Sequence, residues 1–184
     1  MGIKMKTKTY ILIFFILFSG VVFSQDGGYR SQAISSNFST VEIEAYQESA
    51  DKKIEDFYSY LNLLSDKEIS QKVKNEIKEN IFLIYTDRRL AVVDLLSNKS
   101  GKISLSEFLD KTEKQKTNYK LILEKSSNPG LFEDYWLSEY SVEVQLNGEK
   151  SVKKIAQKIY FSPVYKQFGD TTKQVWEIKL GEME

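Results

Sequence analysis

The sequence contains no cysteine and no histidine among its 184 residues, and these absences exclude several kinds of chemistry. A chain without thiols and imidazoles has no disulfide, no cysteine nucleophile, no Ser-His-Asp relay and no zinc site built from the usual nitrogen and sulfur ligands. Only oxygen atoms remain as metal ligands, and we expect no cofactor. Excess charge of one sign is also lacking, because 26 Lys and Arg balance 26 Asp and Glu. This balance gives no general attraction to nucleic acid, which is therefore not an expected partner.

The first 24 residues have the order of a secretory signal peptide. Lysines come first, an apolar run from Tyr10 to Phe18 follows, and small side chains stand at Val22 and Ser24. This order predicts a signal peptide over residues 1–24 that is cleaved after Ser24. An uncleaved anchor is the alternative, but the apolar run is shorter than the roughly 20 residues that cross a bilayer. Because a lipid anchor would need a cysteine, we expect a periplasmic or secreted protein that is not a lipoprotein and has no membrane span after cleavage.

The mature chain divides into a leader and one domain. Residues 25–44 are rich in Ser, Gly and Gln and predict a flexible leader. Residues 45–184 predict a single folded domain, because the chain is 41% hydrophobic and 13% aromatic, as packed globular domains are. A chain of this length buries enough surface to fold without disulfides.

Helical spacing dominates the first half of this domain. Six apolar residues recur at intervals of three and four and predict a first helix: Ala50, Ile54, Phe57, Tyr58, Leu61 and Leu64. Ser65 and Glu68 have the spacing of a capping box and predict the start of a second helix, with apolar positions at Ile69, Val73, Ile77, Ile81 and Ile84. The short link between the two helices predicts antiparallel packing.

The pattern then changes from helix to strand. Leu90 to Leu96 predicts a short strand followed by a turn, and Ser104 with Glu107 predicts the cap of a third helix ending near Lys116. Alternation predicts four further strands: 119–123, 136–146, 152–161 and 176–180. Asn147-Gly148 is a strong hairpin signal, because both residues tolerate positive φ in a type I′ turn. Together these elements predict an α+β domain in which N-terminal helices pack on a curved, mainly antiparallel sheet.

This order of elements, the long strands and the final strand Val175-Trp176-Glu177-Ile178 resemble the nuclear transport factor 2-like (NTF2-like) superfamily of cone-shaped α+β domains. The resemblance spans roughly residues 45–182 and suggests an exported bacterial member. It implies a conical pocket between helices and sheet, a homodimer through the outer face of the sheet, and functions that range from isomerase to scaffold.

Aromatic side chains are dense in the strand region, and we expect most of them in the core. They are Tyr135, Trp136, Tyr140, Tyr160, Phe161, Tyr165, Phe168 and Trp176. Some can line the mouth of the implied cone, where an apolar ring and a polar tip are both satisfied. The candidate ligand pocket consists of Trp136, Ser138, Tyr140, Gln157 and Trp176, and its ligand would be an apolar or aromatic small molecule.

An isomerase-like reaction would need a buried carboxylate beside a hydrogen-bond donor. Asp94 lies in an apolar run and Tyr140 could donate, but no spacing pairs the two residues. We favour the alternative in which Asp94 ends a strand and faces water.

Residues 96–107 resemble the twelve-residue calcium loop of EF-hand proteins. The matching positions include Asn98, Ser100 and Glu107, but Leu96 stands where the first carboxylate ligand belongs. A hairpin turn followed by a capped helix explains the same residues, and we favour it. Calcium binding is kept as a minor alternative.

The sequence therefore favours an exported, non-catalytic binding or assembly module of a bacterial cell envelope, with an envelope protein as its partner. The alternative is a small-molecule carrier or isomerase-like enzyme that uses the cone pocket.

Overall fold

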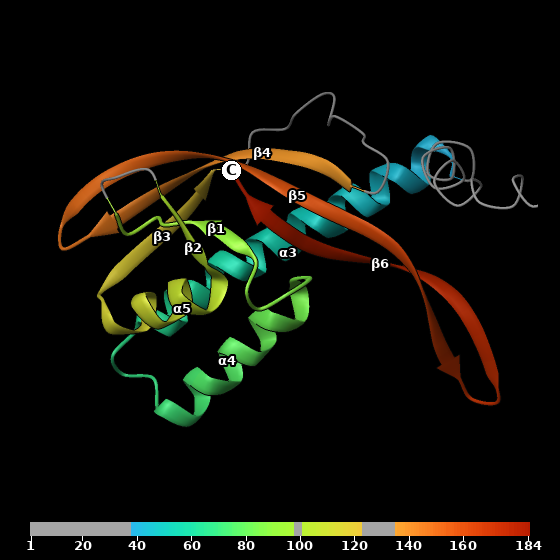
Figure 1. Ribbon diagram of the computed structural model, residues 1–184, viewed down its shortest axis with the longest axis horizontal. Coiled ribbons are helices and arrows are strands. Elements are labelled where there is room, and N and C mark those ends of the chain that lie inside the picture. Colours follow the sequence, from blue (N-terminus) through green and yellow to red (C-terminus); the bar gives the residue numbers. More distant parts are fainter. Residues whose placement is uncertain (1–37, 98–100, 123–134) are drawn as a thin grey trace, which may run out of the picture. The chain divides into compact units, whose positions relative to one another are not determined.

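The computed structural model describes residues 38–97, 101–122 and 135–184, which belong to one unit from Phe38 to Glu184 (Figure 1). The predicted signal peptide and most of the predicted leader lie outside the described residues, as do Asn98 and Ser100 of the calcium-like loop. Within the ranges that are described, no helix is both long and apolar enough to cross a membrane.

The first helix, α3 (Thr40–Ser65), begins inside the stretch predicted as leader. Its start is fixed by a capping box, in which the Ser39 side chain accepts from the Glu42 backbone N–H and the Glu42 carboxylate accepts from Ser39 N at 2.7 Å. The six apolar positions predicted for this helix are all buried. The predicted buried face is thus confirmed.

The capping box predicted at Ser65 and Glu68 is wrong. Ser65 is the last residue of α3, and its hydroxyl donates to the Thr117 carbonyl at 2.6 Å. The second helix, α4 (Gln71–Ile84), starts instead after the N-cap Ser70. In its actual position the helix buries Ile77, Ile81 and Lys74, while Val73 is 41% exposed.

A small hairpin and a short helix follow. Strands β1 (Ala91–Val93) and β2 (Lys102–Ser104) pair antiparallel, and α5 (Leu105–Lys114) begins at once after them. The Ser104 side chain accepts from the Glu107 backbone N–H at 3.2 Å, so Ser104 is the predicted N-cap. The capped helix predicted at the end of residues 96–107 is confirmed, and residues 98–100 of the predicted turn lie outside the described ranges.

The main sheet has four antiparallel strands in the order β3 (Thr117–Ile122), β4 (Tyr135–Leu146), β5 (Glu149–Phe168) and β6 (Thr171–Met183). Asn147 and Gly148 have φ of 53° and 92° and join β4 to β5 in a two-residue turn, as predicted. A second two-residue turn at Gly169 and Asp170 joins β5 to β6. Both strands of this last hairpin are longer than the alternation predicted.

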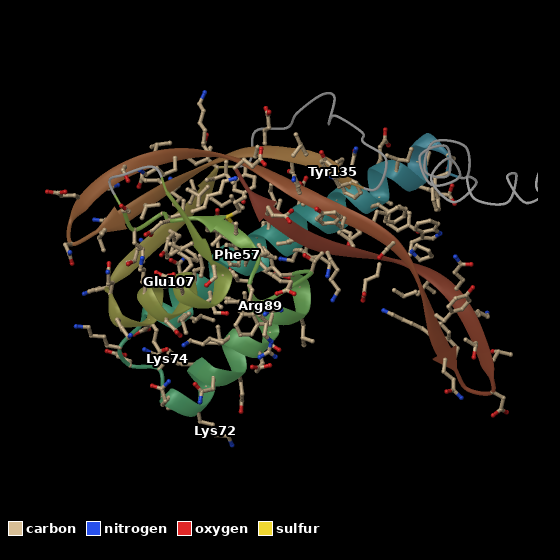
Figure 2. The ribbon with its side chains drawn as sticks, viewed as in Figure 1. Phe57, Lys72, Lys74, Arg89, Glu107 and Tyr135 are labelled. Carbon is tan, nitrogen blue, oxygen red and sulfur yellow. The ribbon has the colours of Figure 1, made fainter. Side chains whose placement is uncertain are left out.

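The helices cover one face of this curved sheet (Figure 1). Helix α3 packs against β3 and β6, and α4 and α5 pack against α3. Figure 2 shows side chains crowded between helices and sheet, with Phe57 among them. The predicted α+β fold, with helices packed on a curved antiparallel sheet, is confirmed.

The last hairpin continues beyond this covered region. The first residue of β4, Tyr135, pairs with Tyr160, so the described part of β4 does not accompany β5 further. We call residues 162–177, which form the outer halves of β5 and β6, the arm. Figure 1 shows the arm extending past the helices.

Candidate functional site

Two of the predicted pocket residues, Tyr140 and Gln157, meet in the interior. The Tyr58 hydroxyl on α3 donates to the Tyr140 hydroxyl at 3.3 Å, and Tyr140 donates to Gln157 Oε1 at 3.2 Å. Gln157 Nε2 in turn donates to the Gly181 carbonyl at 2.7 Å. Gln157 is completely buried, and both tyrosines are almost so. These residues form a continuous buried chain of hydrogen bonds from helix to sheet.

Burial also fixes the protonation state of the two tyrosines in this hydrogen-bond network. Loss of solvation raises the pKa of Tyr58 and of Tyr140 well above the usual range for a phenol. Both hydroxyls therefore keep their protons and act as donors. The arrangement is that of a satisfied core network, which stabilises one packing of α3 on the sheet.

Trp136 and Trp176 lie together in a different group of side chains. The Phe161 ring stacks on Trp176 at 4.5 Å between centroids and lies 6.3 Å from Trp136. Phe38, just before α3, and Tyr46, in its second turn, contact the same Phe161 ring at 5.3 and 4.5 Å between centroids. We call these five side chains the aromatic cluster. It lies at the base of the arm, where β5 and β6 leave the covered part of the sheet.

The fifth predicted pocket residue, Ser138, is opposite Gln157 in the β4–β5 register and is partly exposed. The structure thus joins Tyr140 to Gln157 and Trp136 to Trp176, each pair among its own neighbours. The alternation of the strands correctly placed Gln157 inside. It could not reveal Tyr58, which comes from a helix 82 residues before Tyr140 in the sequence.

Tyr85 is an interior residue that the sequence did not single out. It follows α4 directly and is 2% exposed, and its ring lies 5.2 Å from that of Phe57. Its hydroxyl has no hydrogen-bond partner among the described residues. Burial raises the pKa of Tyr85 well above the usual range, so this hydroxyl is an unused donor inside the domain.

The expectation that Asp94 faces water is wrong. Asp94 is 9% exposed, and its carboxylate accepts from the Leu96 backbone N–H at 3.1 Å and from Lys111 Nζ at 3.1 Å. One carboxylate oxygen thus closes the turn after β1, and the other ties that turn to α5. The partner of Asp94 is Lys111 rather than Tyr140. Asp94 and Lys111 form a structural ion pair and not an acid/base dyad.

The calcium-like loop is described only in part, since Asn98 and Ser100 fall outside. Glu107 lies on α5, and its carboxylate is 3.2 Å from Lys111, the same lysine that binds Asp94. The described ranges contain no group of three or more acidic side chains arranged to hold a metal ion. Both nearby carboxylates are thus ion-paired with the same lysine.

The arm carries apolar side chains that were expected in the core. Tyr165 is 75% exposed and Phe168 is 53% exposed. Val164 and Val175, which pair with each other across the arm, are only half-buried. The sequence contained a signal for this exposure, because Lys and Gln interrupt both faces of the alternation after Phe161. The arm is therefore a candidate binding surface.

Comparisons with protein-family models, curated proteins and solved structures gave no match to this chain. Its function is therefore argued from the interior and the arm.

Proposed function

We propose that this chain is a non-catalytic binding or assembly module of a bacterial cell envelope, with an NTF2-like fold. In this proposal a signal peptide over residues 1–24 directs export and is removed after Ser24. The observation that carries the proposal is the arm, a projecting hairpin with large apolar side chains in solvent.

The interior supports a non-catalytic role. The candidate pocket residues Tyr140 and Gln157 are occupied with each other, with Tyr58 and with the backbone at Gly181. The acidic candidate Asp94 is held by Lys111. Catalysis by general acid and base needs a group within hydrogen-bond reach of a substrate, and these groups already bind protein atoms.

The arm supports a binding role. Exposed large apolar side chains on a projecting element can mark protein interaction sites. Tyr165 and Phe168 project from opposite faces of a hairpin whose base packs against Phe38 and against Tyr46 of α3 through the aromatic cluster. A partner that covers the arm would bury these rings, which the fold itself leaves exposed.

Tyr85 favours a second candidate function, the binding of a small aromatic molecule. Its unused hydroxyl lies in the interior near the Tyr58 and Tyr140 hydroxyls. A ligand with a hydrogen-bond acceptor would satisfy it, provided that the interior opens.

Nuclear magnetic resonance titration with phenol and indole distinguishes the two candidates. A filled interior predicts that about 5 mM probe leaves the amide signals of Tyr58, Tyr140 and Gln157 unchanged, since even millimolar dissociation constants would produce saturation in this range. The control is Tyr85→Phe, which removes the unused donor and keeps the ring. Saturable shifts at these three residues that weaken in Tyr85→Phe would overturn the non-catalytic module and favour the pocket.

Export has its own test. Protein recovered from the envelope fraction of the host should begin at or near Gln25. An amino terminus at Met1 on the envelope-associated protein would reject cleavage after Ser24.

A further inference from the structure

The arm is a two-stranded hairpin that continues alone from a four-stranded sheet. Beyond Tyr160, β5 has no strand on its β4 side within the described ranges, and β6 is the last strand of the sheet. An isolated hairpin is only marginally stable in water, and a third strand is the usual source of further stability. The arm therefore offers two edges to which another strand could be added.

The two edges differ in their capacity to pair. The outer edge of β5 contains Pro163, which has no backbone N–H to donate. The outer edge of β6 contains no proline between Thr171 and Met183. It is covered at Leu180, which pairs with Tyr85 and accepts from the Thr86 backbone N–H at 2.9 Å. From Thr171 to Ile178 this edge has no strand neighbour in the part of the chain that the structure describes.

The charges on the arm are unbalanced within one subunit. Lys166 lies directly opposite Lys173 in the β5–β6 register, and like charges at such positions are destabilising. Lys166 is 3.5 Å from Glu177, which is also 3.8 Å from Lys179. Lys173 makes no ion pair with any described residue. A carboxylate beside Lys173 would therefore relieve the repulsion that the fold retains.

A second copy of the chain supplies such a carboxylate in one register. Lys173, Val175 and Glu177 alternate along β6 and lie on one face. If two β6 edges pair antiparallel about a two-fold axis at Val175, Lys173 lies opposite Glu177 of the partner subunit, and the symmetry makes this pair twice. An axis at Gln174 places Lys173 against a valine, and an axis at Trp176 places it against Lys179 of the partner subunit. Of these three axes, only the one at Val175 places Lys173 opposite a carboxylate.

The other face of the arm is also suited to this register. Gln174 would lie opposite Trp176 of the partner subunit, on the face that carries Tyr165. Tyr165 is the most exposed of the large apolar residues on the arm. In the dimer, β5 and β6 of both subunits would form a continuous four-stranded ribbon, and each subunit would contribute its Tyr165 to the same face.

We propose that the arm is a self-association element, in which the β6 edges of two copies pair antiparallel about Val175 and form a homodimer. This contact joins strand edges, and the outer faces of the two sheets stay free. The inference deepens the assembly role proposed above and rests on it.

Charge reversal tests this register. Light scattering and sedimentation equilibrium of the purified protein between about 1 and 100 µM should give twice the chain mass, since micromolar self-association lies in this range. Lys173→Glu and Glu177→Lys should each weaken the dimer by about tenfold or more, because each places like charges opposite each other twice. The double variant Lys173→Glu/Glu177→Lys should restore a dissociation constant within about threefold of the native value.

The matched control is Lys116→Glu, an equal change of charge at an exposed residue outside the arm, which should leave the dimer unchanged. Circular dichroism on every variant separates lost association from lost folding. A native protein that stays monomeric at about 100 µM, or a folded double variant that stays monomeric, would overturn the proposal. The phenol and indole titration reports on the interior separately, so the two proposals can fail independently.

Discussion

The inner and outer halves of the β5–β6 hairpin belong to the same pair of strands but have opposite environments. In the inner half Ile159 and Leu180 are fully buried under the helices. In the outer half Tyr165 is 75% exposed, although the antiparallel ladder continues unbroken to Phe168 and Thr171. The comparison teaches that the hydrogen bonds between β5 and β6 do not decide which part of the hairpin is buried. The helices decide it, because they supply the apolar surface against which a strand is buried.

The largest expected effect comes from comparing the deletion of a buried ring on the covering helix with the deletion of an exposed ring in the arm. Phe57 lies on α3 and is fully buried, so Phe57→Ala should lower the free energy of unfolding by about 3–5 kcal/mol through lost apolar contacts and a cavity. Tyr165→Ser in the arm should change it by no more than about 0.5 kcal/mol in the monomer. Urea unfolding under monomeric conditions measures both values. Equal losses of unfolding free energy in the two variants would show that the arm is packed as tightly as the core, which would contradict the contrast between the two halves.

A pair of glutamines on β5 gives the next effect. Gln157 bonds to Tyr140 and Gly181 inside, whereas the exposed Gln167 donates to the Gly169 carbonyl at 3.1 Å. Gln157→Leu should cost about 1–3 kcal/mol, because a buried hydroxyl and a buried carbonyl lose their partner. Gln167→Leu should cost less than about 0.5 kcal/mol, since water replaces its bond. Thermal unfolding of both variants checks the difference, and a similar loss in each would contradict it.

Two glycines distinguish crowding from backbone strain. A Cβ on Gly181 would clash with Tyr160 Cε2, and the Tyr160 hydroxyl is held by Glu182 at 3.0 Å. Gly181→Ala should therefore cost about 1–3 kcal/mol through overpacking. Gly169 in the arm turn has φ of 60° with open space around it, so Gly169→Ala should cost about 1 kcal/mol through strain alone.

Asparagine separates the two causes in the same measurement, because it tolerates positive φ but adds more atoms. Gly169→Asn should recover most of the stability, and Gly181→Asn should lose more than the alanine variant. Recovery at Gly181 would mean that crowding by Tyr160 is not the cause.

The smallest effect concerns the ion pairs of the helices. Lys78 lies 2.6 Å from Glu113 and holds the pKa of the Glu113 carboxyl below its usual value. A lowered carboxyl pKa stabilises the fold above the pKa of the unfolded chain, about 4.3, and this contribution disappears as the pH falls through the folded pKa. Glu113→Gln should thus cost less than about 1 kcal/mol at pH 7 and nothing at the acid end. Urea titrations at several pH values check this, and a difference that grows toward low pH would contradict the sign.

Local signals predicted those parts of the fold that local chemistry decides. The Asn147-Gly148 turn and the apolar face of α3 follow from positive φ and from helical spacing, and both are confirmed. The motif Ser-x-x-Glu occurs at Ser39, Ser65 and Ser104, and of these three Ser65 alone is not a helix N-cap. The second is decided by Thr117, 52 residues away, whose carbonyl binds the Ser65 hydroxyl. No local pattern contains that contact.

The candidate site was likewise predictable only where a local pattern decides it. Strand alternation placed Tyr140 and Gln157 inside, but the occupation of their polar atoms depends on Tyr58 and Gly181 from distant segments. The burial of Asp94 also depends on a distant residue, Lys111 on α5. The exposure of Tyr165 had a local signal in Lys166 and Gln167, but an aromatic residue on a strand is usually buried, and among the described residues no helix covers this part of the hairpin.

The meander order of the main sheet has a consequence for the folding pathway. Every strand pairs with the strand that follows it in the sequence, so the β4–β5 and β5–β6 pairs can close from two-residue turns with little loss of loop entropy. The bond from Tyr58 to Tyr140 spans 82 residues and is the more costly closure. We therefore expect the hairpins to form before α3 docks. In kinetic terms, Gly148→Ala should mainly slow refolding, whereas Tyr58→Phe should mainly accelerate unfolding, which stopped-flow measurements in urea would resolve.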